Sequence, residues 1–420
     1  MFYHLLPRSI ACIAAAIVAV AIACWPATAA DPIRIGFGMA LTGPLAANGK
    51  SALLAMKIWE EDINAKGGLL GRPVNLVYYD DQSNPSTVPG IYTKLLDIDK
   101  VELIIGGYGT NMVAPAMPIA IQKKKLLIGL FPVAVNNMFN YPRYFAMNPL
   151  GPEPKTAVTK ALFDVAMAQE PKPQTVAIVG ADSEFSQNAI EGARANAKAA
   201  ELKIVYDQVY PPATADFSPI VRAIRATNPD IVVICSYPLD SVGMVRAVNE
   251  AGFKPKMIGG GMVGLQATAI KTQLGPLLNG FVNYDFWLPV KAMEFPGVLN
   301  LLKTYQARAQ AEGVDPLGYY TPPFAYAYLQ VLGQAVEATK SLDDDKLANY
   351  IHNTSFKTVV GDIKFGRQGE WAQSRVPLVQ FQNITGNGID QFRDLSAEVI
   401  LAPAQYKSGT VIYPYADAKK

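Results

Sequence analysis

The chain has 420 residues, of which 50% are hydrophobic and 17% are charged, and its formal net charge is +2 at pH 7. This length and composition predict a globular protein with a sizeable core, built as two domains or as one large bilobal body. The near balance of basic and acidic residues argues against a binding surface for nucleic acid or for an anionic membrane.

Residues 1–29 have the pattern of a secretory signal peptide. Arg8 precedes the apolar run 10–24, and small residues lead to a cleavage point after Ala29. The run is shorter than the about 20 apolar residues that span a membrane. A lipid anchor at Cys24 is the alternative. We therefore expect a periplasmic protein, soluble after cleavage unless Cys24 carries a lipid.

The turn after the first predicted strand, residues 33–39, has some features of a nucleotide phosphate loop. It reads GPLAANGKS, but five residues separate Gly43 from Gly49, whereas a phosphate loop has four at this place. Pro44 also has no N–H to offer to a phosphate. Because an exported protein meets little ATP, the sequence argues against a nucleotide site.

Strand-like and helix-like stretches alternate from residue 33 onward, which predicts parallel sheets with helices on both faces. A first doubly wound unit is expected to end near residue 131, and a second to begin after the proline-rich joint 148–154. The predicted strands are 33–39, 74–80, 101–107 and 126–131 in the first unit, and 175–181, 203–210, 230–237 and 256–261 in the second. The helices of the first unit are predicted at 52–68, 87–99 and 113–123. Two similar halves suggest two lobes that face each other across a cleft.

The last part of the chain departs from this alternation. Three helical stretches, 295–313, 321–341 and 343–353, come before a late pair of strands near 361–371 and 376–382. Such a segment is best placed to cover both lobes and to cross between them.

The mature chain keeps one cysteine, Cys235, and one histidine, His352. An internal disulfide is therefore impossible, and a histidine-based triad or zinc site would have to be built on His352 alone. Motifs for nucleophilic catalysis are also missing. We expect neither an enzyme nor a protein with a metal or cofactor.

Five segments together resemble one known family, the leucine/isoleucine/valine-binding type of periplasmic solute-binding proteins that feed ABC importers. They are IGFGMALTGPLAANG, DINAKGGLLGRPVNLVYYDDQSNP, IIGGYGTNMVAPAMP, ADFSPIVRAIRATNPDIVV and GDIKFGRQGEW. The resemblance implies an α/β fold of two doubly wound parallel-sheet lobes, joined by three crossovers, with a ligand cleft between them. It implies an N-terminal lobe of residues 31–150 plus 286–374 and a C-terminal lobe of 151–285 plus 375–420. It also implies a monomer that delivers its ligand to an ABC permease in the inner membrane.

The resemblance also implies where the ligand is held. In amino-acid-binding members, groups after the third strand hold the ligand carboxylate, and this place falls on Tyr108, Gly109 and Thr110, with Asn111 beside them. A helix N-terminus at this point would offer free N–H groups to an anion. The pair Asp80-Asp81 resembles a family surface turn.

Two departures from the amino-acid binders bear on the ligand. Val133 stands where they place a second threonine for the carboxylate, and Gly261 stands where they place the glutamate that accepts the α-ammonium group. An ammonium group enclosed without a carboxylate would cost several kcal/mol. We therefore expect an aromatic or aliphatic acid, held among apolar cleft residues after the strands: Phe131, Val133, Phe185, Tyr237, Met262, Phe286 and Trp287.

Two further interpretations stay open from the sequence. One is an ordinary carrier of a branched-chain amino acid, in which Asp285 or Asp240 replaces the missing glutamate. The other is a ligand-sensing protein for a receptor, because the same fold serves in receptor ectodomains. The sequence does not name the ligand.

Overall fold

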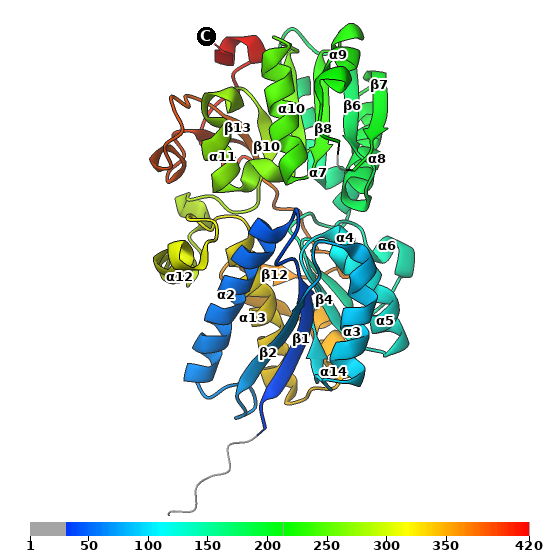
Figure 1. The fold of residues 1–420 in the computed structure, drawn as a ribbon, viewed down its shortest axis with the longest axis vertical. Helices are drawn as coiled ribbons and strands as arrows, with labels where there is room; N and C mark the ends of the chain where they lie inside the picture. Colours follow the sequence, from blue (N-terminus) through cyan, green and yellow to red (C-terminus); the bar gives the residue numbers. More distant parts are fainter. Residues whose placement is uncertain (1–30, 213, 420) are drawn as a thin grey trace, which may run out of the picture.

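The structure is a computed structural model that describes residues 31–212 and 214–419. The predicted signal peptide and Cys24 lie outside these residues. Within the described part, no helix is both long and apolar enough to cross a membrane. The molecule has two α/β lobes, stacked end to end in Figure 1.

The first lobe is built on parallel strands. β1 (Ile33–Met39) lies between β2 (Val74–Asp80) and β3 (Leu103–Ile104), and β4 (Leu127–Leu130) pairs with β5 (Tyr144–Met147). A bridge between Tyr108 and Leu130 joins the two groups of strands. A Cβ atom on Gly107 would lie 2.6 Å from the carbonyl oxygen of Gly38, so only glycine lets these strands approach so closely.

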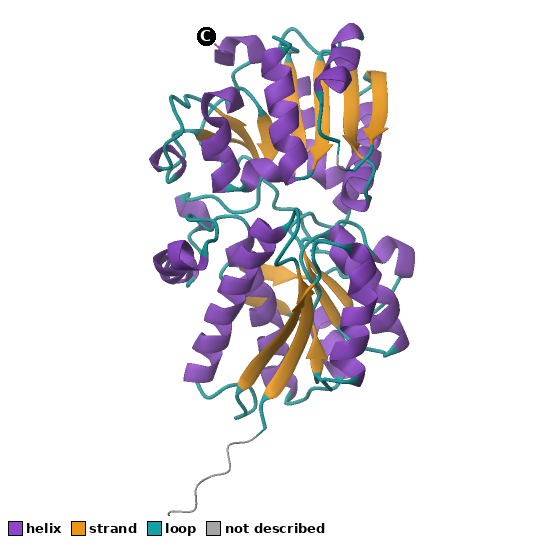
Figure 2. Cartoon of the chain, viewed as in Figure 1, coloured by secondary structure: helices purple, strands orange, loops and turns teal. Residues whose placement is uncertain are grey.

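Helices cover both faces of this sheet (Figure 2). The long helix α2 (Ala46–Ala65) packs against α13 (Thr321–Thr339), which is buried along most of its length and comes from the last part of the chain. The remaining helices of this lobe are α3 (Val88–Asp97), α4 (Thr110–Val113), α5 (Met117–Gln122), α6 (Asn136–Phe139), α12 (Val298–Glu312) and α14 (Asp344–Asn353). A hairpin of β11 (Ser355–Thr358) and β12 (Gly361–Lys364) follows α14.

The second lobe has a seven-stranded sheet in the order β14-β13-β10-β9-β8-β6-β7. β6 to β10 are parallel, and β13 and β14 extend the sheet as antiparallel strands. The strands are β6 (Thr175–Ala181), β7 (Lys203–Tyr210), β8 (Ile231–Ser236), β9 (Met257–Met262), β10 (Val282–Tyr284), β13 (Leu378–Phe381) and β14 (Glu398–Ala402). Its helices are α7 (Pro154–Met167), α8 (Glu184–Ala199), α9 (Ser218–Ala226), α10 (Pro238–Glu250) and α11 (Thr268–Leu274).

The predicted fold class is confirmed, and the strands 33–39, 74–80, 175–181 and 203–210 have the predicted bounds. The helix predicted at 113–123 is wrong as a single element. It is divided into α4, a short 3₁₀ turn (Ala114–Ala116) and α5. Pro115 and Pro118 lack the N–H groups that a continuous helix would need.

The chain crosses between the two sheets near residues 148–154, 285–290 and 372–377, as the order of the strands requires. β14 pairs with β13, the strand that precedes it along the chain, and the sequence did not predict it. The exact limits of the two lobes stay a prediction.

Candidate ligand-binding cavity

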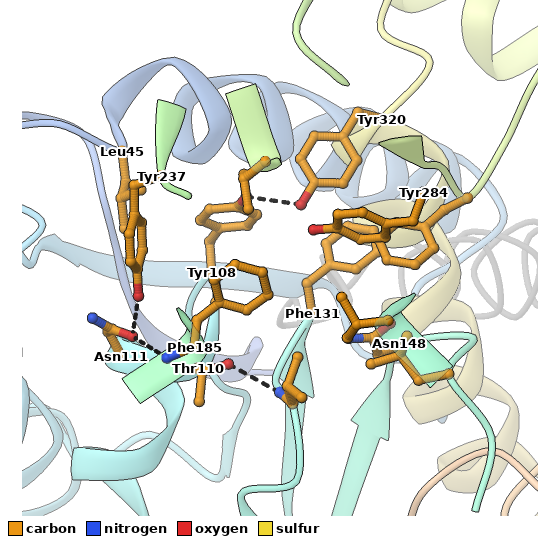
Figure 3. A pocket seen from close by; sticks show the side chains of 16 residues that line it. Leu45, Tyr108, Thr110, Asn111, Phe131, Asn148, Phe185, Tyr237, Tyr284 and Tyr320 are labelled. Atoms are coloured by element: carbon orange, nitrogen blue, oxygen red, sulfur yellow. Dashed lines mark hydrogen bonds between the residues drawn. The ribbon is translucent and has the colours of Figure 1, made fainter. Parts of the chain in front are cut away.

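A small cavity of about 30 Å³ lies between the two lobes. The side chains that line it come from both lobes and are drawn in Figure 3. They are Leu45, Tyr108, Thr110, Asn111, Phe131, Val133, Asn148, Leu150, Val158, Phe185, Tyr237, Val263, Tyr284, Phe286 and Tyr320, together with Gly109.

Most of these residues directly follow a strand. Residues 108–111 come after β3, Phe131 and Val133 after β4, Phe185 shortly after β6, and Tyr237 after β8. The carboxyl ends of parallel strands meet at one edge of each sheet, and open α/β sheets bind their ligands there. The fold therefore gathers these side chains at the facing edges of the two lobes.

Thr110 provides a free hydrogen-bond donor at one end of the cavity. Its Oγ1 accepts a hydrogen bond of 3.0 Å from the N–H of Val133, and its side chain is buried. A hydroxyl group has a single hydrogen, which is left here to donate to a ligand. Thr110 and Asn111 also begin α4, where the first N–H groups of a helix have no acceptor within it. This end of the cavity suits a carboxylate.

Asn111 joins the two lobes. Its Oδ1 accepts a hydrogen bond of 2.6 Å from the Tyr237 hydroxyl and one of 3.2 Å from the N–H of Phe185, both in the second lobe (Figure 3). A third link runs from Asn188 Nδ2 to the carbonyl oxygen of Val133, at 3.1 Å. These hydrogen bonds hold the two lobes together across the cavity.

Aromatic rings form the opposite wall. The ring of Phe131 stacks with those of Phe286 and Tyr320, at centroid distances of 4.8 and 4.9 Å. Phe131 has a φ of 55°, which is costly for a residue with a side chain and is often found at functional sites. Flat rings on one side favour a ligand with a flat or apolar body.

A chain of hydrogen bonds supports the rings. Asn48 Nδ2 donates to the Tyr108 hydroxyl at 2.6 Å, and Tyr108 and Tyr320 share a hydrogen bond of 2.8 Å. Burial raises the pKa of Tyr108 to about 12 and those of Tyr237, Tyr284 and Tyr320 above their ordinary values. All four therefore stay neutral at physiological pH, and the single hydroxyl hydrogen of Tyr237 is already donated to Asn111.

None of the described residues that line the cavity carries a charge. Asp285 is buried, but its Oδ1 accepts the N–H of Phe286, and its neighbours are Lys271 and Glu398 in the second lobe. Asp240 accepts a hydrogen bond from Tyr210 and lines an open groove outside the cavity. Neither aspartate replaces the missing ammonium acceptor in this closed form.

Asp285 should make stability depend on pH. Burial raises its pKa to about 8; the Lys271 ammonium group opposes this shift and the Glu398 carboxylate adds to it. The folded protein holds this proton more tightly than the unfolded chain does. The contribution of the protonated Asp285 carboxyl group to the free energy of unfolding is therefore fully present below about pH 4 and is lost as the pH rises through about 8. We expect Asp285→Asn to flatten the fall of melting temperature between pH 5 and 9. Parallel profiles for variant and wild type would contradict this.

Eight of the ten residues predicted for the site line this one cavity: Tyr108, Gly109, Thr110, Asn111, Phe131, Val133, Phe185 and Tyr237. Gly261 lies behind the wall, since a Cβ atom there would be 2.9 Å from the side chain of Val158. Met262 belongs to the second core, on the other face of the sheet. Trp287, also expected in the cleft, is buried in the crossover near residues 285–290, and its Nε1 donates to the carbonyl oxygen of Met293. That any of the predicted site residues contacts a ligand stays a prediction.

The sequence did not point to several other lining residues, among them Leu45, Asn148, Leu150 and Tyr320. Asn148 and Leu150 follow β5, which was not predicted as a strand. Tyr320 precedes α13 and reaches the cavity from a distant part of the chain.

The first turn differs from a phosphate loop in the structure as well. Lys50 and Ser51 lie inside α2, which begins at Ala46. The expectation that Asp80-Asp81 form a surface turn is wrong, because Asp81 is fully buried and burial raises its pKa to about 6. Asp80 accepts the N–H groups of Leu41 and Thr42, so this pair holds the first turn in place.

Comparison with known proteins agrees with this architecture. The family model described as "Periplasmic binding protein" matches residues 32–387. The chain belongs to the periplasmic binding protein family. Members similar to this one are solute-binding proteins and not enzymes, which confirms that expectation. Within the described residues, no group of three or more histidines, cysteines, aspartates or glutamates could hold a metal ion.

Three relatives of this periplasmic binding protein illustrate the likeness. "Leu/Ile/Val-binding protein homolog 8" of Brucella abortus is 26% identical over 363 residues, covering 84% of this chain and 88% of that protein. A leucine-binding protein, LivK, of Thermotoga maritima has a TM-score of 0.72 at 20% identity, covering 88% of this chain and 98% of its own. A solute-binding protein of R. palustris in complex with 4-hydroxybenzoate has a TM-score of 0.71 at 20% identity, covering 85% and 94%.

Proposed function

We propose that this protein is a periplasmic, monomeric carrier that closes around a small acid and delivers it to an ABC permease in the inner membrane. The ligand is an aromatic or aliphatic carboxylate without an α-amino group. The observation that carries this proposal is the cavity itself, which has hydrogen-bond donors at Thr110 and Asn111, aromatic walls and no charged lining residue.

The uncharged lining distinguishes between classes of ligand. A carboxylate can be held by neutral donors, because a hydroxyl group and N–H groups all point positive ends toward it. An ammonium group in the same space would find no carboxylate, which costs several kcal/mol for a buried charge. The fold is shared by the LivK leucine-binding protein and by the 4-hydroxybenzoate complex, so it accommodates both classes. The lining residues of this chain favour the acid.

The test compares each amino acid with the acid that lacks its α-amino group. We expect 3-phenylpropionate to bind at least about tenfold more tightly than phenylalanine, and 4-methylpentanoate more tightly than leucine by the same factor, which corresponds to about 1.4 kcal/mol. Isothermal titration of the mature protein gives the affinities. Tighter binding of leucine or phenylalanine would instead show a branched-chain or ordinary amino-acid carrier.

A further inference from the structure

Asn148 has a hydrogen-bond acceptor that no described residue satisfies. It follows β5, lines the cavity and is 1% exposed. Its Nδ2 donates to the carbonyl oxygen of Pro132 at 2.9 Å, whereas no donor reaches its Oδ1. The orientation of this amide is fixed by its partner, because the Pro132 carbonyl can only accept and must face the nitrogen. The Oδ1 atom of Asn148 is therefore the one without a hydrogen-bond partner among the described residues.

A buried acceptor without a donor is unfavourable, so such a group usually meets a partner in the functional state. Asn148 shares the cavity with the stacked rings of Phe131, Phe286 and Tyr320. A donor carried by the ligand could reach it only if the ligand extends from the Thr110 end of the cavity toward Asn148.

The distance between Thr110 and Asn148 follows from the peptide group between Pro132 and Val133, which both side chains contact. Its N–H donates to Thr110 Oγ1 at 3.0 Å, and its carbonyl oxygen accepts from Asn148 Nδ2 at 2.9 Å. The two groups of a trans peptide point in opposite directions, so Thr110 Oγ1 and Asn148 Nδ2 lie on opposite sides of it, roughly 8 Å apart. Figure 3 shows the two residues at separate places along the floor of the cavity.

The lining of the cavity selects the kind of donor. An α-ammonium group would be a buried charge with no carboxylate among the lining residues, whereas a ring hydroxyl is a neutral donor. A flat ring between the ligand's carboxylate and this hydroxyl group would lie against the aromatic wall.

We infer that the solute is a hydroxylated aromatic acid, with its carboxylate at Thr110 and its ring hydroxyl donating to Asn148 Oδ1. Asn148 is thereby a residue that determines specificity. This inference rests on the proposed function, since it assumes that the carboxylate binds at Thr110.

The experiment measures the affinities of benzoate, 4-fluorobenzoate and 4-hydroxybenzoate for the mature protein by isothermal titration. Fluorine takes the position of the hydroxyl group but carries no hydrogen to donate. We expect wild type to bind 4-hydroxybenzoate about tenfold more tightly than the other two acids. In Asn148→Leu and in the smaller Asn148→Ala, this preference should fall to about twofold or less.

Equal affinities of wild type for the three acids would overturn the inference, as would a tenfold preference that persists in either variant. If none of the three binds but 4-methylpentanoate does, the inference fails and the proposed function stands. Binding of leucine or phenylalanine in preference to every acid would overturn both. Equal affinities of wild type overturn the inference even if a variant fails to fold, and the two variants test Asn148 with side chains of different size.

Discussion

Thr110→Val is expected to weaken the binding of the best carboxylate ligand by about tenfold or more. The valine has the shape of threonine but lacks the hydroxyl group that we propose donates to the ligand, and a hydrogen bond to a charged group contributes roughly 1.5 to 3 kcal/mol. The same change leaves the N–H of Val133 without the acceptor that it has at 3.0 Å. A modest fall in the melting temperature of the free protein should therefore accompany the loss of affinity.

Thr110→Ser is the matched control for this prediction. Serine keeps the hydroxyl group, so it can accept from Val133 and donate to the ligand, and we expect its affinity to stay within about threefold of wild type. Titration of both variants with the same acid gives the comparison. If Thr110→Val binds within twofold of wild type while its melting temperature falls, Thr110 supports the fold and does not hold the ligand.

Lys271→Met is expected to give the largest loss of stability. Lys271 Nζ contacts both carboxylate oxygens of Glu398 at 2.7 Å, and the two side chains are only 5% and 3% exposed. The pair joins α11 to β14, which is the edge strand of the second sheet. Removing one partner leaves a buried charge unpaired, at a cost of about 3 to 5 kcal/mol. Chemical denaturation of the mature protein measures this change.

Two control variants make this result specific. Lys160→Met removes an exposed lysine that pairs with Asp164 at 2.8 Å, and we expect a change of less than about 0.5 kcal/mol. The double variant Lys271→Met with Glu398→Leu removes both buried charges and should be more stable than Lys271→Met alone. A loss for Lys271→Met no larger than that for Lys160→Met would show that the buried pair contributes little.

Local patterns in the sequence determined the architecture. Alternating apolar strands and amphipathic helices require parallel sheets covered on both faces, because each apolar surface must be buried against another element. They also placed the third predicted strand just before residues 108–111, and strand ends are where this kind of fold binds ligands. The family resemblance assigned the carboxylate site to Thr110 and Asn111, and both residues line the cavity after this strand.

Other features were decided only by the tertiary structure. Tyr320 contacts the ring of Phe131, and Lys271 pairs with Glu398, although long stretches of chain separate the partners. Asn148 looks like any polar loop residue until its amide nitrogen donates to Pro132 and its oxygen is buried without a described donor. Asp81 reads as a surface residue, yet it is buried under the first turn. Periodicity and strand ends are local properties of the chain, whereas burial and pairing arise only when distant segments pack together.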